Sequence, residues 1–281
     1  MNFSPTLMVI GWDNITYVTL YNVDTNECLK LLQQAPALEY YLVAPQDDAM
    51  ININTTTLYP WLHSLDFTSR ETKFLEAISV PSLKELMYNT DSDPLPMMAM
   101  VSLLKCSGCD LKILKLKELQ CTKNLLILLK AVPSLEHLQV NFWQDWNHDG
   151  GIDKILTQIF WSPSGANTIP PEETTGGSFL PHLWVIDCQG NNWSYAPFSW
   201  ECIPQLYYQG HRCSLMLKSI AYASHISDET ALQLLKLTNE GVDLQILDRT
   251  AKGGGDFLEN FRKMVCNLSS TKLSEYVSVV T

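Results

Sequence analysis

The most metal-like stretch of the sequence runs from Asp145 to Asp153. It reads Asp-Trp-Asn-His-Asp-Gly-Gly-Ile-Asp, so oxygen-bearing side chains alternate and a glycine follows, as in a calcium-binding loop. The twelfth position of such a loop carries a bidentate glutamate, but Leu156 stands there. The alternative is a solvated loop after a strand, in which Asp149 or a neighbour caps the next helix. We expect this loop rather than a cation site.

The cysteine and histidine patterns do not indicate catalysis. Cys106-Ser-Gly-Cys109 is a single CxxC, whereas zinc sites pair two such halves or add a paired histidine motif. Cys106 also ends a helical pattern, while a redox thiol would want a helix to begin after it. We expect a helix-to-strand turn with two buried thiols. Because no nucleophile, phosphate-binding or metalloprotease motif occurs in the sequence, we expect no catalytic residue, no metal and no cofactor.

Aromatic residues are the third group of candidates, because exposed aromatics anchor protein interfaces. Several fall in loop-like segments: Trp143, Trp146, Trp193 and Trp200, together with Phe142, Tyr195 and Phe198. The alternative is that these rings pack over the edges of the core. The sequence leaves both interpretations open.

Composition narrows the classes of protein and partner. The chain has 281 residues, 46% hydrophobic and 17% charged, which is typical of a globular protein rather than a disordered one. Its net charge of −11 disfavours nucleic-acid binding. No apolar run is long enough to predict a membrane span, and the first residues make a poor secretory signal. The eight scattered cysteines favour reduced, buried thiols, so we expect a cytoplasmic or nuclear protein.

The elements that position any site follow from one short repeat, apolar-x-x-apolar-x-apolar. Its clearest copies are Leu111-Lys-Ile-Leu114-Lys-Leu116 and Leu135-Glu-His-Leu138-Gln-Val140. The central apolar residues of the nine copies are Val18, Tyr41, Leu65, Leu86, Leu114, Leu138, Ile186, Ile220 and Leu244. Most intervals between them lie within or near the roughly 20–29 residues of leucine-rich repeats.

Proline supports the same periodicity. It stands two residues before the first leucine in five copies, at Pro36, Pro60, Pro81, Pro133 and Pro181. Proline cannot extend a helix, so it separates each helix from the next strand. Helical patterns fill the intervals at 26–34, 72–78, 97–105, 122–131, 152–160 and 228–239. The interval of 48 residues from Leu138 to Ile186 hides a degenerate repeat or an insertion, and prolines and glycines between 161 and 178 favour the insertion.

We interpret the repeat as an α/β leucine-rich-repeat solenoid, with a parallel sheet on the concave face and helices outside. One strand-helix unit is too small to bury its own apolar face, so neighbours stack to make a continuous core. The alternative is a closed or doubly wound α/β domain. We expect the solenoid over residues 1–250, with a loop insertion at about 161–180, and a C-terminal cap helix and flexible tail over 251–281.

Three segments resemble fungal F-box proteins with degenerate leucine-rich repeats. They are Leu20 to Pro36, the Pro-Ser-Leu-Glu-His-Leu junction at 133–138, and Ile226 to Leu235. The resemblance covers residues 12–265. In that family an N-terminal F-box docks on the Skp-type adaptor of a cullin ubiquitin ligase, and the solenoid selects the protein to be ubiquitinated. Because the first repeat begins by Ile15, we expect no F-box in this sequence, and adaptor contacts only if one is encoded upstream. The alternative is a general interaction scaffold without a ligase connection.

Strand alternation then names a predicted protein-binding face, because residues between the core positions point away from the core. The candidates are Tyr17, Thr19, Tyr21, Tyr40, Asp66, Glu85, Met87, Lys115, Lys117, His137, Gln139, Asn141 and Asp187. This mixture of polar, aromatic and charged groups favours a protein or peptide over a small apolar ligand. Lys115 and Lys117 form a basic spot, beside which we expect an acidic segment of the partner. The alternative is a face that is merely solvated.

Overall fold

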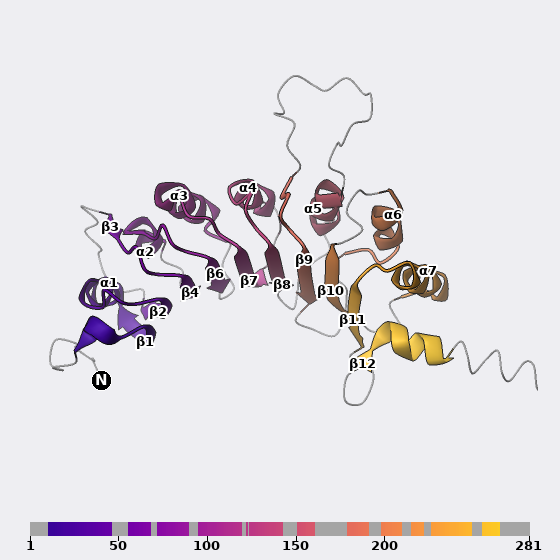
Figure 1. Ribbon diagram of the computed structural model, residues 1–281, viewed down its shortest axis with the longest axis horizontal. Coiled ribbons are helices and arrows are strands. Elements are labelled where there is room, and N and C mark those ends of the chain that lie inside the picture. Colours follow the sequence, from indigo (N-terminus) through magenta and orange to yellow (C-terminus); the bar gives the residue numbers. More distant parts are fainter. Residues whose placement is uncertain are drawn as a thin grey trace, which may run out of the picture.

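A large, mostly parallel sheet with helices along one side makes up the protein (Figure 1). The computed structural model describes residues 11–46, 56–68, 72–89, 95–119, 122, 124–142, 151–160, 179–190, 198–209, 215–221, 226–248 and 255–264. The sheet has ten strands, and their order across the sheet is their order in the chain. Two further short strands do not belong to this sheet and form a separate two-stranded sheet. The predicted α/β class and parallel sheet are therefore confirmed.

Nine parallel strands carry the nine repeat copies, and a tenth strand closes the far edge in the antiparallel sense. The sheet contains β1 (Tyr17–Asp24), β2 (Tyr40–Gln46), β4 (Ser64–Thr68), β6 (Glu85–Asn89), β7 (Ile113–Leu119), β8 (His137–Phe142), β9 (Val185–Gly190), β10 (Met216–Ala221), β11 (Leu244–Asp248) and β12 (Gly255–Asp256). The separate pair is β3 (Thr57–Leu58) and β5 (Ile78–Ser79). The sequence did not predict this pair.

The helices follow the outer side of an arch, and the strands line its inner side (Figure 1). They are α1 (Thr25–Gln34), α2 (Lys73–Glu76), α3 (Met97–Ser107), α4 (Leu125–Lys130), α5 (Gly151–Phe160), α6 (Cys202–Gln209) and α7 (Asp228–Asn239), after a short 3-10 turn η2 (Trp12–Asn14). A further helix covers 257–264, where a cap helix was expected. Six of the seven helices match predicted patterns; α6 was missed.

Local chemistry explains where these helices begin and end. The Asp24 carboxylate accepts a hydrogen bond from the Asn26 N–H at 2.8 Å and so caps α1. The Ser227 hydroxyl does the same for α7, accepting from the Thr230 N–H at 3.2 Å. Helix α3 ends at Gly108, whose φ of 59° lies in the left-handed region that glycine tolerates. The five prolines that were expected to separate a helix from the next strand all lie in exposed turns before a strand.

The central repeat residues stack across the sheet as one buried row. Register pairs each of Val18, Tyr41, Leu65, Leu86, Leu114, Leu138, Ile186, Leu217 and Leu244 with its neighbour on the next strand. All of these side chains are buried. Eight of the nine positions agree with the predicted frame. The prediction of Ile220 was wrong: Leu217 takes that place on β10.

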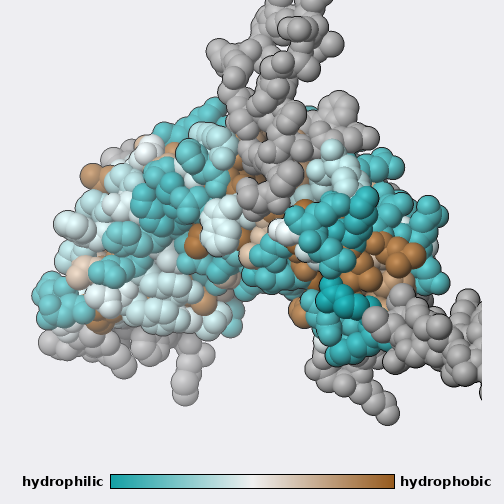
Figure 2. Space-filling view, turned by 45° about the vertical axis from the view of Figure 1, so that its right-hand side comes forward, coloured by the Kyte–Doolittle hydropathy of each residue, from teal (hydrophilic) through white to brown (hydrophobic). Residues whose placement is uncertain are grey.

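Strands β8 and β9 are direct neighbours, from His137 paired with Val185 to Phe142 paired with Gly190. The interval of 48 residues therefore contains no skipped strand of this sheet, which agrees with an insertion. The insertion itself lies outside the described residues. Seen from another side, the surface mixes hydrophilic and hydrophobic residues, and hydrophobic residues gather near the C-terminal end of the arch (Figure 2).

Candidate functional site

Two rows of side chains cross the inner face of the sheet, on either side of the buried row. We call them the first row and the second row. The first row contains Tyr17, Tyr40, Ser64, Glu85, Ile113, His137, Val185 and Met216. The second row contains Thr19, Leu42, Asp66, Met87, Lys115, Gln139, Asp187, Lys218 and Gln245. Neighbours within a row lie on strands about 4.8 Å apart, so each row runs without a break across the strands, although Val185 in the first row is buried.

Tyrosines occupy the β1–β2 end of this surface. The rings of Tyr17 and Tyr40 are stacked, with centroids 4.6 Å apart and planes 8° from parallel. The Thr19 hydroxyl donates a hydrogen bond to the Tyr17 hydroxyl at 3.1 Å. Tyr17 is 59% exposed and Tyr21, further along β1, is 63% exposed. Two large aromatic side chains therefore remain open to a partner at this end of the sheet.

Asp66 lies two strands from this edge, in the second row. Its neighbours Leu65 and Phe67 are fully buried in the core, so the alternation of β4 turns Asp66 to the inner face. Only 8% of Asp66 is exposed, and burial raises the pKa of its carboxyl above the usual value. Lys117 opposes this shift in pKa and Glu85 adds to it. The site therefore contains a largely desolvated carboxylate.

The centre of the surface is a set of paired charges. The Lys115 Nζ lies 2.6 Å from the Glu85 Oε1, and each side chain is about a quarter exposed. The Ser64 hydroxyl lies 3.4 Å from the other Glu85 oxygen. Lys115 is thus not an open cation, because Glu85 already neutralises much of its charge. The expected docking of an acidic segment at Lys115 and Lys117 therefore competes with an ion pair within the chain.

His137 and Asn141 on β8 each carry a buried polar atom that finds no hydrogen-bond partner among the described residues. These atoms are the Nε2 of the imidazole and the Oδ1 of the amide. Burial lowers the pKa of His137, an effect that Asp187 opposes and Lys115 and Lys218 reinforce. A buried donor or acceptor without a partner is unfavourable, and a bound polar group would relieve this. These atoms lie on either side of Gln139, which is half-buried in the second row.

The C-terminal part of the surface contains a residue that the sequence analysis missed. Register places Lys218 beside Asp187 in the second row, whereas the predicted frame of β10 pointed Ser219 to that face. Ser219 is buried instead, and its hydroxyl donates to the Cys188 carbonyl at 2.8 Å. Asp187 is also held, because the Gln189 amide donates to both of its oxygens at 2.9 and 3.0 Å.

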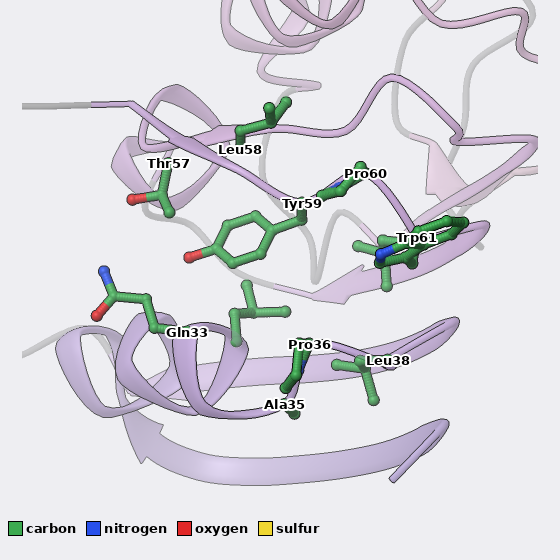
Figure 3. A pocket seen from close by; sticks show the side chains of 11 residues that line it. Gln33, Ala35, Pro36, Leu38, Thr57, Leu58, Tyr59, Pro60 and Trp61 are labelled. Carbon is green, nitrogen blue, oxygen red and sulfur yellow. The ribbon is translucent and has the colours of Figure 1, made fainter. Parts of the chain in front are cut away.

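One pocket lies outside these rows, between α1 and the segment that contains β3 (Figure 3). Its volume is about 260 Å³, and it lies where the outer layer changes from a helix to an extended strand. Trp61 and Leu58 line it although they are 62% and 61% exposed. Tyr59 lies across it, and its hydroxyl is buried. Ligand pockets usually hold roughly 300–1,000 Å³, so this one suits a side chain better than a whole ligand.

Three of the aromatic residues expected in loop-like segments belong to the core. Phe142, Phe198 and Trp200 are all buried, and the Phe198 and Trp200 rings meet edge to face with centroids 4.8 Å apart. This agrees with packing rather than with an interface at these positions. Trp143, Trp146, Trp193 and Tyr195 lie outside the described residues.

The metal and thiol candidates give no site in the described ranges. Asp153 lies in the first turn of α5, and its carboxylate accepts from the Ser199 N–H at 3.1 Å. Residues 145–150 lie outside the described residues. No cluster of ligands suited to a metal occurs among the residues that the structure describes. The predicted helix-to-strand turn at 106–109 is present, but the prediction of two buried thiols was wrong. Cys106 is exposed and Cys109 is half-buried, because α3 turns the first outward.

Comparison with known proteins adds no relative: no protein family, no curated protein and no solved structure matches this chain. Within the described ranges, no helix has both the length and the apolar character needed to cross a bilayer.

Proposed function

We propose that the chain is a leucine-rich-repeat solenoid that acts by binding another protein on the inner face of its sheet. The observation that carries this proposal is the pair of rows across nine in-register parallel strands, with tyrosines at one end and charged and amide groups further on. A surface of this length and mixed chemistry suits a polypeptide segment, because interfaces combine aromatic anchors with polar groups.

Binding rather than catalysis is supported by the state of the reactive groups. Burial raises the pKa of Cys28 to about 11 and of Cys202 to about 12, so the thiolate nucleophile is disfavoured at both. The Cys28 thiol packs in the core. The Tyr41 hydroxyl donates a hydrogen bond to the backbone carbonyl oxygen of Cys28 at 3.2 Å. The described pocket is small and lies on the outer layer, away from the charged rows. These features fit structural roles.

The resemblance to F-box receptors extends the proposal to a role in ubiquitin ligation, in the cytoplasm or nucleus. In that case the bound protein is a substrate that a cullin ligase modifies when the repeat domain is joined to an adaptor-binding segment. The alternative is a scaffold with no ligase. Affinity purification of the chain, in its natural reading frame, distinguishes them: recovery of Skp-type adaptor and cullin supports the receptor, and stable partners without them support the scaffold.

The test of the binding face is site-specific photo-crosslinking. A photoreactive residue at Gln139, on the inner face, should capture a specific protein from cells that express the chain. The same residue at Ile127, which is 49% exposed on the outer helix α4, is the matched control. Capture from Gln139 but not from Ile127 is expected. Equal capture at both positions, or capture at Ile127 alone, would place the interface elsewhere.

Two double variants map the captured partner along the rows. Lys115→Glu with Lys117→Glu reverses the central charges, and Tyr17→Ala with Tyr21→Ala removes the exposed rings. At least one pair should weaken binding by about tenfold or more, as the loss of one interface anchor does. If the partner binds both variants as tightly as it binds the unmodified chain, the inner face is not the interface.

A further inference from the structure

The β1–β4 end of the inner face combines exposed tyrosines with a buried carboxylate. Tyr17 and Tyr40 stack on neighbouring strands, and Asp66 lies on the next strand, β4. Register pairs Tyr40 with Ser64 and Leu42 with Asp66, so Asp66 is the diagonal neighbour of Tyr40 on the same face, within reach of a long aromatic side chain. Burial raises the pKa of Tyr40, and the charges of Asp66, Tyr17, Glu85 and Tyr21 add to this. The aromatic faces and the carboxylate therefore form one cluster.

The carboxylate of Asp66 lacks the partners that a buried charge needs. Within the described ranges, no hydrogen-bond donor and no ion-pair cation reaches it; the nearby lysines act on it only at longer range. Lys115 is held by Glu85 instead. The Asp66 oxygens are not among the fully buried unpaired atoms of the described residues, so an incoming group can reach them. Burial of most of the side chain disfavours its charged form, so a cation delivered from outside would be favoured here.

Charge around the cluster points the same way. In the described residues 11–46 and 56–68, five acidic residues stand against one basic residue: Asp13, Asp24, Glu27, Glu39 and Asp66 against Lys30. Lys30 is itself paired with Glu27 at 2.7 Å. By contrast, six lysines stand against four acids in the described part of 84–142: Lys84, Lys105, Lys112, Lys115, Lys117 and Lys130 against Glu85, Asp110, Glu118 and Glu136. The acidic excess therefore belongs to the N-terminal end of the described chain as a whole, whereas the charges that act on Asp66 itself are Lys117, Glu85 and Lys115.

We propose that Asp66, Tyr17 and Tyr40 form a subsite for an arginine side chain of the bound protein segment. The guanidinium donates to the Asp66 carboxylate, and its plane stacks on a tyrosine face. Arginine fits better than lysine, because its flat, weakly hydrated cation combines stacking with forked hydrogen bonds to a carboxylate. This inference rests on the proposed use of the inner face for protein binding and names the chemistry of the partner at one end of it.

The probe for the subsite is a small arginine derivative, N-acetyl-arginine methylamide. It is titrated into the full chain labelled with 3-fluorotyrosine and followed by fluorine NMR. The Tyr17 and Tyr40 signals are assigned from Tyr17→Phe and Tyr40→Phe. Both signals should shift and saturate. The citrulline analogue, which has the same shape without the charge, should bind at least about tenfold more weakly, because a charged hydrogen bond is lost.

Asp66→Asn is the decisive variant, and Asp228→Asn is its matched control. The control removes the same kind of charge, but Asp228 is exposed on helix α7 and belongs to neither row of the inner face. Asp66→Asn should weaken arginine binding by about tenfold while the control leaves it unchanged. Asp66→Asn should also unfold at a higher urea concentration than the unmodified chain at pH 7, because it removes an unpaired buried charge.

Three outcomes overturn the subsite. One is binding of the citrulline analogue as tightly as the arginine probe. Another is arginine binding that Asp66→Asn leaves intact. The third is a lower urea midpoint for Asp66→Asn, which would make Asp66 a structural partner within the chain. Failure here leaves the binding-face proposal standing, since that is tested separately by crosslinking from Gln139. If that crosslinking fails while the arginine probe still binds saturably, the cluster binds a free guanidinium but is not part of a protein interface, and both proposals are rejected.

Discussion

The N-terminal strands β2–β6 and the central strands β7–β8 follow the same repeat, but they differ in the elements that cover the sheet and in the side chains that fill the core. Between β2 and β6 the outer layer is thin, with the β3–β5 pair and the four-residue helix α2, and the core is aromatic. Phe67 and Phe74 stack with centroids 5.2 Å apart, and Tyr88 meets Phe67 at 5.8 Å. Around β7–β8 the outer layer is the helices α3 and α4, and leucines fill the core.

The inner face also differs between the N-terminal end and the centre. On β1 to β4, open tyrosines lie near a carboxylate that no described residue pairs with, whereas in the centre the charges pair within the chain. Lys115 on β7, for example, lies 2.6 Å from Glu85 on β6. The repeat thus fixes the strand and its buried row, while the outer layer and the inner face vary from copy to copy. We expect stability to depend on the rows that repeat and binding to depend on those that vary.

The largest expected effects come from the two cores. Phe74→Ala should lower the free energy of unfolding by about 3–5 kcal/mol and Leu138→Ala by about 2–5 kcal/mol, since each leaves a cavity among buried neighbours. Leu114→Ala should resemble Leu138→Ala. Urea unfolding measures all three, with the exposed Ile127→Ala as a control expected within about 0.5 kcal/mol. An unchanged midpoint for both leucine variants would contradict the repeat register.

A buried serine joins the two regions. The Ser107 hydroxyl, at the end of α3, accepts from the Val80 N–H at 2.9 Å, and Ser107 is 7% exposed. Ser107→Ala should therefore cost about 1–3 kcal/mol, because a buried N–H loses its acceptor. Ser102→Ala on the exposed side of the same helix is the matched control. If the two variants unfold at the same urea concentration, the contact contributes nothing and the regions are less coupled than their contact implies.

Acid should act on the two regions with opposite sign. Burial lowers the pKa of His137 below the ordinary value of 6.5, so the unfolded chain takes up a proton first and stability falls as the pH drops below about 6.5. Burial raises the pKa of Asp66, so the folded chain takes up that proton first and stability is gained as the pH falls towards 3.8. His137→Gln should reduce the loss between pH 7.0 and 5.5 in urea unfolding. A loss as large as in the unmodified chain would show that His137 is not the cause.

The smallest effect belongs to the central charges. Lys115→Met removes the partner of Glu85, but both side chains are about a quarter exposed, so solvent screens the pair. The free energy of unfolding should fall by less than about 1 kcal/mol. Lys84→Met, whose pair with Asp110 is more exposed, should change it less still. A loss above that range for Lys115→Met would mean that the centre depends on its inner face, and not only on its core, for stability.

The sequence was sufficient to place eight of the nine parallel strands in register, because a copy with leucine, isoleucine, valine or an aromatic at its buried positions has only one apolar frame. It failed at β10, where Ser219 takes a buried position and Ile220 offers a more apolar but wrong frame. It also missed α6, in which Pro204 falls in the first turn, where a missing N–H does no harm. Alternation identified Asp66 as an inner-face residue, but its burial depends on neighbouring strands that no local pattern describes.

Backbone hydrogen bonds differ between the two ends of the parallel strands. At the start of successive strands, a single carbonyl accepts from two N–H groups of the next strand, as Glu39 does from His63 and Ser64 at 2.8 and 3.0 Å. The two register irregularities, at Asn22 and near Glu118, both lie towards the opposite ends of their strands. The strands are therefore held to one another more tightly at their starts than at their ends. Slower amide hydrogen exchange at Ser64 than at Thr68 would be the expected sign of this difference.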